Sequence, residues 1–223
     1  MRLICETYQM SIEFYENKVS VLTIEDPDTF ANLLQGLYGQ LPEADQGFVL
    51  FEGNKKLSLD KCAEIVSDPF ALHINNRKVL GKLYQELKEI SDEDHFLTMK
   101  GINTQMVGYL DELCLKVPYP IHFRSEVDVQ EIFKVYGIEL ELTTGSLTEK
   151  LITYMEVMRK LCHVSLMIFI NVKCFLNESQ LLELYKAASY CKMNVLLVEN
   201  TQRMVLDGES NTILDAENCL IQF

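Results

Sequence analysis

The feature that most constrains the fold is an almost unbroken apolar run at residues 164–171, VSLMIFIN. A run that is apolar at every position is typical of a strand covered on both faces within a largely parallel sheet. A second such run, NVLLVE at 194–199, follows after one helix-length segment, and the two predict a strand–helix–strand unit with parallel strands. A third run, VSVLTI at 19–24, would complete the sheet, which is therefore built from both ends of the chain.

The middle of the chain changes to a helical period. Apolar positions 80–87 form one stripe and positions 99–113 continue it after a break at SDED, where Ser91 and Asp94 indicate a helix start. The acids at 92–94 would then complement the helix dipole. Two long helices predict an antiparallel helical arm, with short strands at 119–123 and 138–142 after it. We therefore predict an α/β head at residues 1–59 and 143–223, with a mainly helical leg at 60–142.

Composition limits the class of protein. The 223 residues are 48% apolar and 24% charged, which is ordinary globular usage. No apolar stretch approaches the roughly 18–20 residues needed to cross a bilayer, and the first six residues lack the layout of a signal peptide. The seven cysteines form no CxxC pair, and the four histidines show no zinc-ligand spacing. We expect a cytoplasmic protein with reduced thiols and no membrane association.

Sites for catalysis are missing from the expected positions. The loop after the first strand reads Glu25-Asp26-Pro27-Asp28, with no glycine and three carboxylates that would repel a phosphate. No GxxxxGK[ST] is present, and Asn171 follows the central strand where a nucleotide hydrolase places a magnesium-binding Asp. We predict a protein that is not an enzyme and binds no nucleotide. A metal-dependent nuclease using Glu25, Asp26 and Asp28 is an alternative, although helix capping explains these acids better.

Four blocks of sequence occur in an order that resembles one known family. They are VLTIEDPDTF at 21–30, VSDPFALHINNRKVLGKLYQEL at 66–87, MIFINVKCFL at 167–176 and ILDAE at 213–217. They are similar to the ring-forming adaptation protein of type II-A CRISPR systems, the Csn-two family. None is a catalytic signature, so the resemblance rests on their joint order across nearly the whole chain.

The resemblance implies a fold, an assembly and a function. The head would be a P-loop-like fold, degenerate and without a Walker motif, with an inserted α-helical leg. Four subunits would form a homotetrameric ring whose lysine-lined hole receives double-stranded DNA ends. This ring would act in spacer acquisition beside the CRISPR integrase complex and the RNA-guided effector nuclease. The alternative is a degenerate P-loop-like protein-interaction scaffold in the adaptation complex, without DNA affinity of its own.

Candidate DNA contacts must overcome a net charge of −13, which by itself argues against nucleic acid. A ring can concentrate a few cations on its inner surface while its outside stays acidic. Lys55 and Lys56 lie at the tip of a predicted hairpin with Gly53 in its turn. Lys173 and Arg203 follow the carboxyl ends of two central strands, where α/β sheets usually bind ligands. Solvated surface charge is the alternative for each of the four.

Calcium is the cofactor that the resemblance implies, held by carboxylates near the head–leg junction. His122 and Arg124 stand where the family has acids, which leaves Glu126, Asp128 and Glu131 as candidate ligands. Calcium takes about six oxygen ligands, several of them carboxylates. The alternative is a surface helix whose N-terminus carries acids.

Overall fold

The chain forms two compact units in the computed structural model, which describes residues 1–39, 47–141 and 144–223. We call residues 1–74 and 142–223 the head and residues 75–141 the leg. The strands are β1 Arg2–Cys5, β2 Met10–Glu13, β3 Val19–Ile24, β4 Phe48–Glu52, β5 Lys55–Leu57, β6 Ala63–Val66, β7 Leu166–Ile170, β8 Asn194–Glu199, β9 Glu209–Leu214 and β10 Leu220–Gln222. The helices are α1 Pro27–Leu37, α2 Leu59–Cys62, α3 Arg77–Asp94, α4 Phe96–Cys114, α5 Val129–Val135, α6 Leu147–Lys160 and α7 Glu178–Tyr190, with a short 3-10 helix, η1, at Val172–Cys174.

The head is organised around a six-stranded sheet in the order β10-β9-β3-β8-β7-β6. Strands β9, β3, β8, β7 and β6 are parallel, and β10 pairs antiparallel with β9 at one edge. The three apolar runs form the adjacent strands β3, β8 and β7, as the sequence predicted. Every residue of β3 and β7 is buried, which accounts for their lack of alternation.

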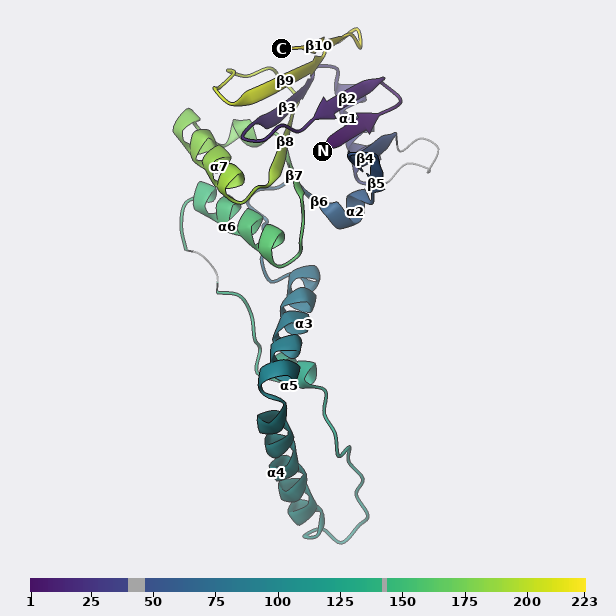
Figure 1. The fold of residues 1–223 in the computed structure, drawn as a ribbon, viewed down its shortest axis with the longest axis vertical. Helices are drawn as coiled ribbons and strands as arrows, with labels where there is room; N and C mark the ends of the chain where they lie inside the picture. Colours follow the sequence, from purple (N-terminus) through teal and green to yellow (C-terminus); the bar gives the residue numbers. More distant parts are fainter. Residues whose placement is uncertain (40–46, 142–143) are drawn as a thin grey trace. The chain divides into compact units, whose positions relative to one another are not determined.

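Different layers cover the two faces of this sheet. A four-stranded antiparallel sheet, β2-β1-β4-β5, includes the predicted hairpin β4–β5 and contributes Leu3 and Leu50 to one core cluster with Leu22, Leu33 and Val198. Figure 1 shows β1, β2 and α1 on one side of the six-stranded sheet and α6 and α7 on the other. The core therefore lies on both faces of β3, β8 and β7.

Helix α6 begins with a capping box. The Ser146 hydroxyl accepts a hydrogen bond from the Glu149 backbone N–H, and the Glu149 carboxylate accepts one from the Ser146 N–H at 2.7 Å. Hydrogen bonds from Ser146 lower the pKa of Glu149, although its side chain is exposed. Behind this cap, Leu151, Met155 and Met158 are fully buried and give the helix its apolar face.

The leg contains α3, α4, α5 and irregular chain. The Asn76 side chain caps α3 by accepting from Val79 N at 3.0 Å. The neighbouring Asn75 side chain makes two hydrogen bonds with the backbone of Leu140, donating to its C=O and accepting from its N–H, each at 2.9 Å. Tyr84 on α3 donates to Ile138 O at 3.0 Å. These bonds hold the beginning of the leg against its end.

The α3–α4 connection differs from the predicted antiparallel arm. Helix α3 ends at Asp94 and α4 begins at Phe96, so His95 alone joins them. One residue cannot reverse a chain, because even a tight helical hairpin needs a loop of about two to five residues. Ser91 and the acids after it form the last turn of α3, where His95 N donates to Ser91 O, so these acids do not complement a helix start.

Two further expectations for the leg were wrong. Residues 119–123 and 138–141 form no strand, and Asn75 rather than a neighbouring strand satisfies the backbone at Leu140. Residues 60–66 were placed in the leg, but β6 pairs with β7 through Ala63↔Leu166, and the structure divides the chain after Ile74. Residues 142–143, at the second predicted boundary, lie outside the described residues.

Within the described part of the chain, no helix is both long enough and apolar enough to cross a membrane.

Candidate functional site

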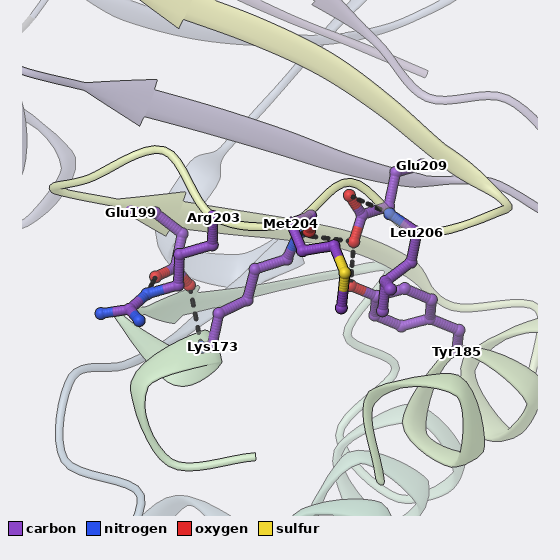
Figure 2. A network of polar contacts seen from close by, with 7 residues as sticks. All are labelled: Lys173, Tyr185, Glu199, Arg203, Met204, Leu206 and Glu209. Atoms are coloured by element: carbon purple, nitrogen blue, oxygen red, sulfur yellow. Dashed lines mark hydrogen bonds and ion pairs between the residues drawn. The ribbon is translucent and has the colours of Figure 1, made fainter. Parts of the chain in front are cut away.

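Lys173 was predicted to contact DNA from the carboxyl edge of the head sheet, but the structure buries it. Its backbone lies in η1, directly after β7, and its side chain is 3% exposed. The ammonium forms an ion pair with Glu209 at 2.7 Å and donates a hydrogen bond to Met204 O at 3.2 Å (Figure 2). Lys173 is therefore enclosed by its own chain and presents no charge to a phosphate at the surface.

Glu209 is the common acceptor of this buried network. Its side chain is 0% exposed, and besides Lys173 it accepts hydrogen bonds from Tyr185 OH at 2.6 Å and from Leu206 N at 3.2 Å. Burial, together with the bond to the Glu209 carboxylate, raises the pKa of Tyr185 well above its usual range. The network thus joins η1, α7 and the first residue of β9, and it fixes the segment between β8 and β9.

Glu199, the last residue of β8, is the most unusual group at this edge. One carboxylate oxygen accepts a hydrogen bond from Lys173 N at 3.0 Å, and the other is buried and has no hydrogen-bond partner among the described residues. The Arg203 Nε lies 3.8 Å from that second oxygen. Burial raises the pKa of Glu199 to about 7, against the opposing effect of the Lys173 hydrogen bond.

Sequence reasoning did not identify Glu199, Glu209 or Tyr185. The only signal for Glu199 is a single carboxylate at the end of an otherwise apolar run, NVLLVE. Buried carboxylates need partners, so such an acid predicts a nearby cation. The partners come from segments distant in sequence, and a single sequence does not show which segments meet.

The other three predicted DNA contacts do not form one surface with Lys173. Arg203 is 40% exposed on its side chain and donates to Cys174 Sγ at 2.9 Å. Lys55 and Lys56 are exposed on β5, an edge strand of the other sheet. Arg203, between β8 and β9, and Lys55 and Lys56, on β5, are therefore at least partly exposed but lie on separate elements.

The acids after β3 serve the fold. The Asp26 carboxylate caps α1 by accepting from Thr29 N at 2.7 Å, and this bond lowers the pKa of Asp26. Pro27 occupies the first turn and Asp28 complements the helix dipole. No described group of three or more His, Cys, Asp or Glu side chains is arranged to hold a metal, and this applies to Glu25, Asp26 and Asp28. The nuclease alternative therefore has no metal centre in the described chain.

Two of the candidate calcium ligands, Asp128 and Glu131, form caps and ion pairs within the leg. Asp128 caps α5 by accepting from Gln130 N at 3.1 Å, and it also pairs with Lys88 at 3.2 Å. These hydrogen bonds lower the pKa of Asp128. Glu131 pairs with Lys134 at 2.8 Å. With Glu126 they do not make a cluster of ligands, so this donor set does not fit calcium.

Comparison with known proteins identifies the family. The sequence model of CRISPR-associated protein (Cas_Csn2) matches residues 40–218, which is more than half of the chain. The chain belongs to the Csn2 family. This confirms the resemblance carried by the four sequence blocks.

Two curated relatives agree with this membership. The CRISPR-associated protein Csn2 of Enterococcus faecalis is 28% identical over 212 residues, covering 92% of each chain. The CRISPR-associated protein Csn2 of Streptococcus agalactiae is 21% identical over 187 residues, covering 82% of each. A bacterial Atm1-family ABC exporter with ATP bound has 11% identity and a TM-score of 0.39, covering 92% of this chain and 33% of its own. That likeness is too low to support any conclusion.

Proposed function

We propose that this Csn2-family chain is a non-catalytic ring that binds double-stranded DNA ends without sequence preference during CRISPR spacer acquisition. The observation that carries the proposal is the family match over residues 40–218. In this proposal the chain works in the cytoplasm beside the CRISPR integrase complex and the RNA-guided effector nuclease. In this proposal no nucleotide takes part in the DNA contact.

The carboxyl edge of the sheet supports a role without hydrolysis. In a nucleotide hydrolase, backbone amides at the start of the helix after the first strand bind phosphate. In this chain Asp26 already occupies that helix N-terminus, with its carboxylate 2.7 Å from Thr29 N. The strand–loop–helix order of β3 and α1 within a parallel sheet supports the further proposal that the head is a degenerate P-loop-like fold.

The leg supports assembly into a homotetramer. None of the 19 residues of α4 is buried, and Ile102, Met106 and Tyr109 are each at least half exposed. A helix with its apolar side chains in water is stabilised when they pack against another surface. In this proposal that surface belongs to another subunit.

The test compares one plasmid as a relaxed closed circle and after linearisation, by filter binding. A closed ring that threads a free end binds the linear form and not the circle, and its affinity falls steeply with salt. Equal affinity for both forms contradicts threading.

One observation favours a second candidate, the scaffold without DNA affinity. The burial of Lys173 removes one of four predicted phosphate contacts. Absence of binding to both plasmid forms, with the protein folded, would decide for the scaffold.

A further inference from the structure

The two ends of the parallel strands in the head differ in charge: acids predominate after the strands, where the cations are Arg203 and the buried Lys173, whereas lysines and acids are mixed before the strands. Acids at the carboxyl ends are the buried Glu199, which is the last residue of β8, and, after the strands, Glu25, Asp26, Asp28, Asp68, Asp215 and Glu217. Cations that precede the strands at their amino ends are Lys18 before β3, Lys61 before β6 and Lys192 before β8, with the acids Glu16, Asp60 and Asp207 at the same edge. Phosphates bind where cations gather, so the charge favours the amino edge, opposite to the usual ligand edge of an α/β sheet.

Three segments form a hollow of about 530 Å³ at this amino edge. They are residues 15–19, which lead into β3, residues of α7 from Leu182 onward with 192–194, and residues 207–208 before β9. Hydrogen bonds join the segments: Ser189 donates to the Asn17 side chain at 2.5 Å, and Val19 N donates to Gly208 O at 2.9 Å. The hollow is therefore built by the fold of the head.

Lys18, Lys186 and Lys192 line the hollow and are all exposed. Unlike Lys173, none of the three forms an ion pair with any residue that the structure describes. Glu16 and Asp207 also line the hollow, so the cations exceed the acids by one there, in a chain whose net charge is −13.

Lys192 occupies a position where lysine is costly. It follows Cys191, the C-cap of α7, and has φ 52, in the left-handed region where helices usually end on glycine or asparagine. A side chain in this conformation is strained, because its Cβ lies close to the following carbonyl oxygen. Complementing the helix dipole accounts for a cation near the end of α7, but it does not account for Lys18, which lies on no helix.

We propose that Lys18, Lys186 and Lys192 bind the phosphodiester backbone of duplex DNA at the amino edge of the head sheet. The proposal rests on the DNA-binding function proposed above and gives it a site. The contacts are made to phosphates and carry no sequence information. The carboxyl edge, with its seven acids, faces away from the DNA.

The test measures the dissociation constant for a fluorescent linear duplex over a series of salt concentrations. The variant K18Q/K186Q/K192Q is expected to reduce the slope of log K against log salt by about three. At 0.1 M salt its affinity should fall on the order of a hundredfold or more. The variant K18R/K186R/K192R keeps the three charges and should keep the slope.

A matched control removes the same charge from exposed lysines elsewhere, as K82Q/K100Q/K150Q. An equal loss in both glutamine variants would mean that net charge and not this hollow attracts DNA, and would overturn the proposal. A full slope in K18Q/K186Q/K192Q overturns the site while the DNA-binding function stands. No binding by the unaltered protein overturns both.

A second measurement does not depend on variants. Acetylation of lysines by a soluble reagent, read by mass spectrometry, should be slowed at Lys18, Lys186 and Lys192 when duplex DNA is added. Protection at Lys55 and Lys56 without protection at these three would contradict the proposed site.

Discussion

At the residue scale, Lys173 and Glu199 show how burial changes the meaning of a charged side chain. In the sequence, Lys173 is a cation after a central strand and Glu199 is one acid after an apolar run. In the structure the Lys173 ammonium lies against Glu209, and its backbone N–H binds Glu199. The main effect of both side chains is therefore on the stability of the head.

Replacing Lys173 should destabilise the head strongly. Lys173→Met leaves the Glu209 carboxylate buried without its cation, and breaking a buried pair from one side costs about 3–5 kcal/mol. Urea unfolding measures this loss. Lys55→Met, at an exposed position, should stay within about 0.5 kcal/mol of the unaltered protein. In buffer without urea, if Lys173→Met is still folded, the slope of log K for DNA against log salt should equal that of the unaltered protein. A lower slope would show that Lys173 does contact DNA.

Glu199 should make stability fall with rising pH. Burial raises its pKa from 4.5 to about 7, so between these values the folded chain keeps a proton that the unfolded chain has lost. Stability is therefore lost as pH rises through this window. Glu199→Gln removes the titration, and its stability relative to the unaltered protein should increase by on the order of 2 kcal/mol from pH 5 to pH 8. A constant difference in urea unfolding across this range would show that the carboxyl does not titrate there.

At the element scale, the most predictable parts of the chain were those whose pattern depends on local contacts. The apolar runs gave β3, β7 and β8, and Gly53, at φ 57, lies in the turn of the β4–β5 hairpin as expected. The strand predicted at 138–142 was wrong for residues 138–141, because alternation alone does not supply the partner that a strand needs. In the leg, Asn75 takes the place of that partner.

The candidate site was less predictable than the fold. Position at the carboxyl end of a strand made Lys173 and Arg203 candidates, but it did not show which of them faces water. That depends on Glu209 and Tyr185, which arrive from β9 and α7. The acids at 92–94 were misplaced for a similar reason: α3 continues through them to Asp94, and no glycine or proline in the sequence marks its end.

The capping box of α6 should contribute measurably to the stability of the head. Ser146→Ala removes the hydroxyl that accepts from Glu149 N and donates to the Glu149 carboxylate, and it leaves only the bond from the Ser146 backbone N–H to that carboxylate. We expect a loss of about 1 kcal/mol in thermal or urea unfolding. Lys150→Ala, an exposed change on the same helix, should have little effect. Equal stabilities for the two variants would mean that the cap is dispensable.

At the scale of the whole molecule, the proposed ring depends on α4. The exposed Ile102 and Met106 lie one helical turn apart, so they share a face. We expect analytical ultracentrifugation of the unaltered protein to give about 103 kDa, four times the chain mass of 25.7 kDa. The variant I102E/M106E places two charges on this face and should sediment as a smaller species.

Thr104→Glu is the control for this prediction. Thr104 is exposed on the same helix, and the substitution adds one charge away from Ile102 and Met106. It should keep the mass of the unaltered protein. A tetramer that survives I102E/M106E would place the subunit contacts elsewhere, and a monomer at every concentration of the unaltered protein would contradict assembly altogether.

The bonds between Asn75 and Leu140 also affect the order in which the chain folds. Strands β6 and β7 are neighbours, yet Ala63 and its partner Leu166 are 103 residues apart in sequence. Once Asn75 and Leu140, which are 65 positions apart, are joined, the loop that must close for Ala63 to pair with Leu166 shortens from 103 to about 38 residues. The entropic contribution to the free-energy cost of closing this loop then falls by about 1 kcal/mol. A leg that forms before β6 pairs with β7 therefore favours that pairing by shortening the loop.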